Sequence, residues 1–230
     1  MDDDIEFMID LMHHKDDISW RKVSQWSSEL SYDFMRKYKD KLIWEDICVY
    51  QELDEEFMRE MLEYIDWKVI GKHQELSESF MREFADKLDW SVLTEYQKNF
   101  SESFIKDFGD KLNWDHLSRY HKLSEKMIEA FKYKVNWRFI SRYQVLSEDF
   151  IRDYKKYVDW VNISQNDKLK LSDGFMREFI NELRIVFLSC SHQLSESFIR
   201  DYVTDVCWYD ICMYQKLSEP FILEFADKVV

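Results

Sequence analysis

The sequence predicts an all-α protein, an α-solenoid of about nine short helix-turn-helix repeats. Two observations lead to this fold class. The 230 residues include only 3 Gly and 1 Pro, whereas strands joined by tight turns draw heavily on both residue types. In addition, a tryptophan recurs at intervals of 23 to 25 residues, with an isoleucine in one place, in the series Trp20, Trp44, Trp67, Trp90, Trp114, Trp137, Trp160, Ile185 and Trp208.

The first helix of each repeat is expected to begin at the tryptophan. Apolar residues follow three and six positions later, as Leu93 and Tyr96 follow Trp90, and this spacing is typical of one face of a helix of about two turns. In five repeats the preceding residue is Asp or Asn, whose side chains are good N-caps. These predicted caps are Asp66, Asp89, Asn113, Asn136 and Asp159.

The second helix of each repeat is expected to begin at a Leu-Ser-Glu sequence or a close variant. The serine can cap the next turn, and the acid after it suits the positive end of the helix dipole. In most repeats this acid lies four residues before a base, as Glu55 precedes Arg59 and Glu78 precedes Arg82, which favours ion pairs along the helix. The predicted capping serines are Ser77, Ser101, Ser124, Ser147, Ser172, Ser195 and Ser218.

The domain organisation follows from the size of the repeat. A unit of about 23 residues cannot bury its own apolar face, but stacked units cover one another. We therefore expect one α-solenoid domain over residues 18–230, with the recurring tryptophans forming a continuous core. Residues 1–17 hold seven acids and one base and form an acidic N-terminal lead segment.

Charge and hydropathy limit the partners and the location. The formal net charge is −14, and an acidic protein repels nucleic acid and anionic lipid at long range. No apolar run approaches the roughly 18 residues of a membrane span, and the acidic start is unlike a secretory signal. The four cysteines are few and irregularly spaced, which suits a reducing compartment. We expect a soluble cytoplasmic protein that binds neither nucleic acid nor membranes directly.

The repeat pattern W-x-x-I-S-x-Y-Q-x-L-S-E-x-F-I-R-E-F-x-D-K-L resembles a short tandem repeat found in many proteins of large DNA viruses. Trp137 to Val158 and Trp208 to Val229 are most similar to it. The resemblance implies a viral origin and a repeat scaffold, with the host-cell cytoplasm or the virion as the location. It implies no catalytic residues. The seventh repeat departs from the pattern, with Asn166 at the tyrosine position and extra residues near Lys168–Leu171.

The sequence predicts no catalytic, cofactor-binding or metal-binding residues, and hence no enzyme. His73, His121 and His192 occupy repeat positions that hold Tyr or Gln elsewhere, which indicates substitution within the repeat. The sequential pair His13–His14 is a weak metal signal without a second cluster. Cys48 and Cys212 lie where other repeats have Ser, Thr or Gly, so small size is the expected requirement there.

A partner-binding surface is predicted on the first helices, where large apolar residues follow the tryptophan position. The alternative is that the adjacent repeat buries these side chains, as large apolar residues are usually inside. The candidates are Phe139, Val161, Val186, Phe187, Tyr209 and Met213.

Three functions are compatible with this sequence. The leading hypothesis is a non-enzymatic scaffold that mediates protein–protein interaction, because repeat architectures offer an extended surface. The alternative is a structural or self-assembling virion-associated protein, since the chain ends at Val229–Val230 without a polar capping helix. A further alternative is an acidic decoy that occupies a nucleic-acid-binding protein.

Overall fold

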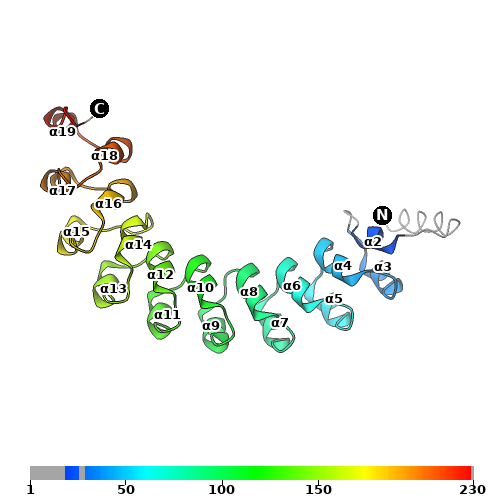
Figure 1. The fold of residues 1–230 in the computed structure, drawn as a ribbon. Helices are drawn as coiled ribbons and strands as arrows, with labels where there is room; N and C mark the ends of the chain where they lie inside the picture. The colour runs from blue at the N-terminus through cyan, green and yellow to red at the C-terminus, as the bar shows by residue number, and fades with distance from the viewer. Residues whose placement is uncertain (1–18, 26–28, 229–230) are drawn as a thin grey trace. The chain divides into compact units, whose positions relative to one another are not determined.

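The protein is all-α, as the computed structural model shows for residues 19–25 and 29–228, the part of the chain that it describes. Eighteen short helices follow one another in this part and form nine pairs, one pair for each predicted repeat (Figure 1). The acidic lead segment and the His13–His14 pair lie outside the described residues. None of the described helices combines the length and the apolar character that a membrane crossing requires.

The chain groups into two compact units, each made of whole repeats. The first unit, Met1–Asn113, holds repeats 1 to 4. Its first helices, α2, α4, α6 and α8, contact one another in sequence. The helices of this unit are α2 (Trp20–Ser24), α3 (Tyr32–Lys37), α4 (Trp44–Tyr50), α5 (Glu55–Glu60), α6 (Trp67–His73), α7 (Glu78–Glu83), α8 (Trp90–Tyr96) and α9 (Glu102–Phe108).

The second unit, Trp114–Val230, holds repeats 5 to 9. Its first helices, from α10 to α18, again contact one another in sequence. Both units therefore have the stacked arrangement of a helical solenoid. The helices of the second unit are α10 (Trp114–Tyr120), α11 (Glu125–Ala130), α12 (Trp137–Tyr143), α13 (Glu148–Asp153), α14 (Trp160–Gln165), α15 (Asp173–Glu178), α16 (Ile185–Ser191), α17 (Glu196–Asp201), α18 (Trp208–Tyr214) and α19 (Glu219–Glu224).

The predicted N-caps are largely confirmed. Every predicted serine caps its second helix by accepting a hydrogen bond from the backbone N–H three residues later. Asp66, Asp89, Asn136 and Asp159 cap their first helices in the same way. These bonds satisfy backbone donors that helices of six or seven residues would otherwise leave exposed.

Phenylalanines of the second helices form the centre of the core, and most of the tryptophans lie at its edge. Phe80, Phe104 and their equivalents are buried, whereas Trp44 is the one tryptophan that is buried among those described. The Trp90 indole packs against Phe104 and donates its N–H to the Ala85 carbonyl at 2.9 Å. The expectation of a continuous tryptophan core is therefore wrong in part, because the indole N–H is held at the rim where a carbonyl is available.

Ion pairs join successive second helices. Six arginines each pair with an acid of the following repeat at 2.5–2.9 Å, and each guanidinium lies over the Phe ring of that repeat at 4.8–5.4 Å. We call this set the arginine ladder: Arg36, Arg59, Arg82, Arg152, Arg177 and Arg200. The predicted pair Glu55–Arg59 is also present, at 3.6 Å.

The predicted pair Glu78–Arg82 is not formed. The Glu78 carboxylate instead accepts from the backbone N–H and the hydroxyl of Ser101 in the next repeat, and Arg82 pairs with Asp107. Glu55 also accepts from the next repeat, at the Ser77 N–H, and still pairs with Arg59. At Glu78 both carboxylate oxygens are bonded to Ser101 by charge-assisted hydrogen bonds.

Buried amide side chains join successive first helices. Gln97 accepts from the Leu76 N–H at 3.1 Å, and its Nε2 donates to the carbonyls of Gly71 and Gln74 at 2.9 and 2.7 Å. One side chain thus satisfies three backbone groups of the preceding repeat. We call the residues that bond the preceding repeat in this way the glutamine ladder: Gln51, Gln74, Gln97, Gln144, Asn166 and Gln215.

A hydroxyl at the fifth position of the first helix makes a second connection. The Ser164 hydroxyl donates to the Trp160 carbonyl at 2.8 Å and accepts from the Arg184 N–H of the next repeat at 2.9 Å. Cys48, Gly71 and Cys212 occupy this position in three repeats. Burial raises the pKa of the Cys48 thiol to about 11, so this sulfur stays protonated. Small size is therefore only part of the requirement at this position, since the hydroxyl also bonds the following repeat.

Candidate functional site

The predicted partner-binding residues all lie in the second unit, on its first helices. Four of them are exposed: Val161 by 39%, Val186 by 52%, Tyr209 by 72% and Met213 by 61%. We call these four residues the apolar row. Val161, Val186 and Tyr209 occupy the same position in α14, α16 and α18, and these helices contact one another in that order. Tyr209 and Met213 are four residues apart, so they share one face of α18.

The apolar row is confined to the last three repeats. In the first six repeats the same position, directly after the tryptophan, is polar or charged and exposed. It holds Arg21, Glu45, Lys68, Ser91, Asp115 and Arg138. The row is therefore a local feature of repeats 7 to 9 and not a requirement of the fold.

Phe139 and Phe187, the other two candidates, are half-buried. They lie two residues after the tryptophan position, where the side chain packs toward a neighbouring repeat. The Phe139 ring lies 6.2 Å from that of Tyr143, and the Arg119 guanidinium lies over it at 5.6 Å. Phe139 thus lies beside Arg119 and Tyr143, two residues that line a groove not identified from the sequence.

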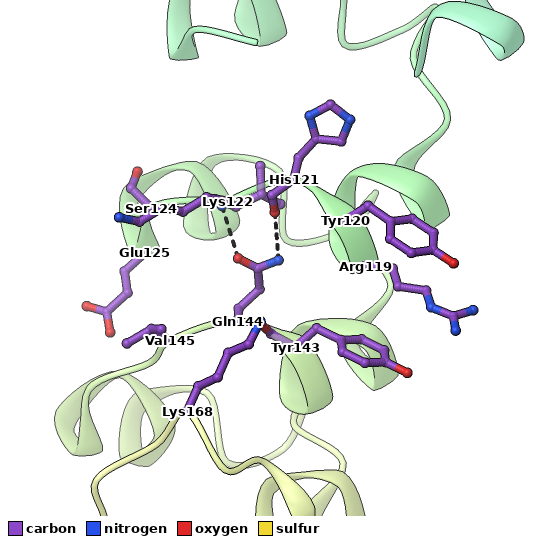
Figure 2. A pocket seen from close by; sticks show the side chains of 11 residues that line it. Arg119, Tyr120, His121, Lys122, Ser124, Glu125, Tyr143, Gln144, Val145 and Lys168 are labelled. Carbon is purple, nitrogen blue, oxygen red and sulfur yellow. Dashed lines mark hydrogen bonds between the residues drawn. The ribbon is translucent and has the colours of Figure 1, made fainter. Parts of the chain in front are cut away.

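This groove lies between the ends of α10 and α12, in repeats 5 and 6, and has a volume of about 400 Å³. Gln144 of the glutamine ladder lies near the middle of the side chains that line it (Figure 2). It accepts from the Leu123 N–H at 3.0 Å and donates to the carbonyls of Ser118 and His121 at 2.9 and 2.8 Å. Because these backbone groups are already bonded to Gln144, a ligand would be recognised mainly by the side chains of the walls.

The walls of the groove are basic and aromatic. The Arg119 guanidinium lies over the rings of Tyr120 and Tyr143, at 5.0 and 5.3 Å. The Lys168 Nζ donates to the Tyr143 carbonyl at 2.9 Å. Figure 2 shows Arg119 and the two tyrosines on one side of Gln144, with Glu125 and Val145 on the other. We call this site the basic groove, and its cations are Arg119, Lys122 and Lys168.

Lys168 reaches the groove because the seventh repeat departs from the pattern. The connection after α14 carries two extra residues, and Asn166 turns it by accepting from the Lys168 N–H at 3.1 Å. Asn166 also makes the ladder bonds to the carbonyls of Ser141 and Gln144. The sequence did contain a signal for this site, namely the extra residues near Lys168, but it did not show which groove they face.

An equivalent groove of about 300 Å³ lies in the first unit, between the ends of α6 and α8. Gln97 lines it as Gln144 lines the basic groove, and the Lys72 Nζ lies 5.0 Å from the Tyr96 ring. Glu75 stands where the basic groove has Lys122, and no third cation contributes to this lining. The two grooves share a backbone frame and differ in charge.

The charge of the chain is unevenly distributed. Residues 1–113 hold 15 Lys and Arg against 28 Asp and Glu, whereas residues 114–230 hold 17 against 18. The formal charges are thus −13 and −1. The net charge of −14 therefore belongs almost entirely to the unit that does not contain the basic groove.

The structure also bears on the predictions about metal binding and about His192. Within residues 19–25 and 29–228, no three His, Cys, Asp or Glu side chains gather in a way that could hold a metal ion. His192 is buried at a glutamine-ladder position, and burial lowers its pKa. The backbone of Ile163 and Ser164 nearby opposes this shift.

The fold and these surfaces define a tandem helical-repeat protein with Trp-led helix pairs of about 23 residues. Searches against protein-family models, curated proteins and solved structures found no match to the chain.

Proposed function

We propose that this protein is a non-enzymatic repeat scaffold that binds a partner protein through the first helices of repeats 7 to 9. The observation that carries the proposal is the exposure of the apolar row on three helices, each in contact with the next. Contiguous exposed apolar residues are typical of protein interaction sites. Exposed Tyr and Met suit this role, since both are enriched at interfaces.

The repeat motif supports a viral setting for this scaffold. From the resemblance to tandem repeats of large DNA viruses, we expect the proposed partner in the host-cell cytoplasm or in the virion. The motif itself accounts for folding, since its Ser, Gln and Arg residues cap helices or join repeats. The variable exposed positions are therefore where a partner would be recognised.

The test is affinity capture from a native lysate with the wild-type protein and two matched double variants. Val186→Glu with Tyr209→Glu places charges in the apolar row, and Lys68→Glu with Ser91→Glu changes the same repeat positions in the first unit. A stoichiometric partner that is retained by wild type and by the control, but lost from the row variant, supports the proposal. Equal retention by all three proteins contradicts it.

A second candidate function is self-association, favoured by the last described repeat. Ile222 of α19 is 38% exposed, whereas the equivalent Ile151 and Ile199 are fully buried. Its neighbour Leu223 is 77% exposed. Another copy that covered this surface would bury both side chains. Sedimentation of wild type and of Ile222→Lys over a range of concentrations tests this, since only wild type should then form larger species.

A further inference from the structure

The basic groove carries an inference that rests on the proposed scaffold function and names a partner chemistry for a second site. We propose that the basic groove, lined by Arg119, Tyr120, Lys122, Tyr143 and Lys168, binds an extended acidic peptide segment of a partner protein. Three features of the groove support this: its unmatched charge, its aromatic walls and the insertion that supplies Lys168.

The cations of the groove are not neutralised by the chain itself. The arginines of the arginine ladder all pair with carboxylates. In the described part of the chain, by contrast, no carboxylate lies within ion-pair distance of Arg119, Lys122 or Lys168. A chain with 46 acids and 32 bases thus leaves three cations around one groove unpaired. A ligand with carboxylates supplies the complementary charge.

Glu125 lowers the charge of the groove by one but leaves it net positive. It is the one acidic residue that lines the groove, and its Oε1 already accepts from the Ser147 N–H at 2.5 Å. The carboxylate is thus held by the cap of the next second helix, as Glu78 is held by Ser101. It therefore serves the junction between repeats and leaves the cations available to a ligand.

The aromatic walls favour a peptide over a free anion. Tyr120 is 63% exposed and Val145 is 62% exposed, so the groove offers apolar surface on both sides of Gln144. Arg119 spans the two tyrosine rings at 5.0 and 5.3 Å, which orients its guanidinium while leaving N–H donors available. Such a fork binds a carboxylate through two parallel hydrogen bonds. Side chains beside that carboxylate would contact the rings.

Nucleic acid is a poorer occupant on charge grounds. The polyphosphate backbone carries one charge per nucleotide over its whole length, and residues 1–113 of the same chain carry −13. A short acidic segment places only a few carboxylates in the groove. It gains the local attraction with less repulsion from the rest of the chain.

The test measures binding of a short fluorescein-labelled peptide of alternating Asp and Ser by anisotropy. A peptide with Asn in place of Asp is the neutral control. Wild type is expected to bind the acidic peptide alone, with affinity that falls as salt is raised. Arg119→Glu with Lys168→Glu is expected to lower the affinity by about tenfold or more, since it removes two attractions and adds two repulsions.

The matched control is Lys72→Glu with Lys98→Glu, which makes the same charge change in the equivalent groove of the first unit. It is expected to leave the affinity unchanged. Equal loss in both variants would indicate general electrostatics and overturn the proposal. Tighter binding of an oligothymidylate of the same charge, or self-association that the Arg119 and Lys168 variant abolishes, would also overturn it, in favour of nucleic acid or of a second copy.

The outcome is separable from that of the scaffold proposal. Val186→Glu with Tyr209→Glu should not affect peptide binding, because it leaves the basic groove intact. If this variant loses its captured partner while no protein form binds the acidic peptide, the scaffold proposal stands and the groove inference fails. If no partner is captured and no peptide binds, both fail. Circular dichroism of each variant verifies that the helices are retained.

Discussion

Successive repeats are joined by two polar connections, a buried amide side chain and a hydroxyl of the first helix. Two junctions each keep one of these connections and lack the other. Between α6 and α8, Gln97 makes three hydrogen bonds to the preceding repeat, but Gly71 supplies no hydroxyl. Between α14 and α16, the Ser164 hydroxyl bonds the next repeat, but both ring nitrogens of His192 lack a hydrogen-bond partner among the described residues. Burial does not explain the difference, since Gln97 is 8% exposed and His192 is 6% exposed.

The longer connection after α14 explains why His192 is tolerated. In a regular repeat a glutamine accepts the N–H of the leucine that follows the first helix, as Gln97 accepts from Leu76. In the seventh repeat this connection is two residues longer, and the Leu169 N–H is bonded to the Asn166 carbonyl at 3.2 Å. The backbone that faces His192 is thus partly bonded within its own repeat. The repeat can thus lose one of its two connections where the backbone finds another partner.

The largest effect is expected from removing the glutamine where it is fully bonded. Gln97→Leu keeps the approximate volume and leaves three buried backbone groups without partners, at about 1–3 kcal/mol each, so a loss of roughly 3 kcal/mol or more is expected. His192→Leu removes no such bond and should be neutral or stabilising. Urea unfolding followed by tryptophan fluorescence measures both. Similar losses in the two variants would contradict the comparison.

The next largest effect is a gain from completing the first junction. Gly71→Ser adds a hydroxyl in the place that Ser164 occupies, where it can accept the Asp89 N–H. The new Cβ would meet Leu93 and Val92 side-chain atoms at 3.5 and 3.6 Å, which is ordinary contact. The expected gain is about 1–1.5 kcal/mol from helix propensity and one hydrogen bond.

Gly71→Ala is the matched control, because it adds the Cβ without the hydroxyl. Alanine has the better helix propensity, by about 0.5 kcal/mol. A serine variant at least as stable as the alanine variant would therefore show that the hydroxyl bond forms. A serine variant that is less stable than wild type would show that the hydroxyl is buried without a partner.

Much of the fold follows from the sequence, for a reason visible at single residues. The spacing of the tryptophans predicted the helix pairs. Ser77 and Asp89 predicted where helices begin, because a side-chain cap is a local interaction. The ion pair expected between Glu78 and Arg82 is absent, and both side chains bond the next repeat. Glu55 and Arg59 also bond the next repeat and still pair with each other. Which pairs form therefore depends on contacts between repeats that the sequence does not show.

The basic groove could not be predicted in the same way. Arg119, Tyr143 and Lys168 come from three successive repeats, and their proximity depends on how the repeats stack. The recurring glutamine was visible in the sequence, but its three bonds required the backbone of the preceding repeat. The sequence left open whether the predicted surface residues are exposed or buried by the adjacent repeat. Val186 and Tyr209 are exposed, whereas Phe139 is half-buried against a neighbour.

A smaller effect is expected from pH at the second junction. Burial lowers the pKa of His192 in the folded chain. In the unfolded chain its pKa is the ordinary histidine value of about 6.5. Below that pH the unfolded chain therefore binds a proton at His192 more readily than the folded chain does. Stability is then lost as the pH falls through that value. Asp167 is the charged group that favours protonation and opposes this trend. The free energy of unfolding is measured at pH 7.5 and at pH 5.5. Between these two values it should decrease more for wild type than for His192→Leu. Equal decreases in the two proteins would contradict the assignment.

The smallest effect is expected at the outer contacts, where the two junctions are alike. Arg82 pairs with Asp107 at 2.5 Å and lies 5.2 Å from the Phe104 ring, and Arg177 pairs with Asp201 at 2.6 Å and lies 5.4 Å from the Phe198 ring. Methionine at either arginine keeps the contact with the ring and removes the charge. Because exposed ion pairs are weak and screened by salt, both variants should lose less than Gly71→Ser gains, with losses that disappear at high salt. Equal losses of stability in the two variants would show that the junctions differ only in their buried connections. Unequal losses would show that the junctions also differ between their second helices.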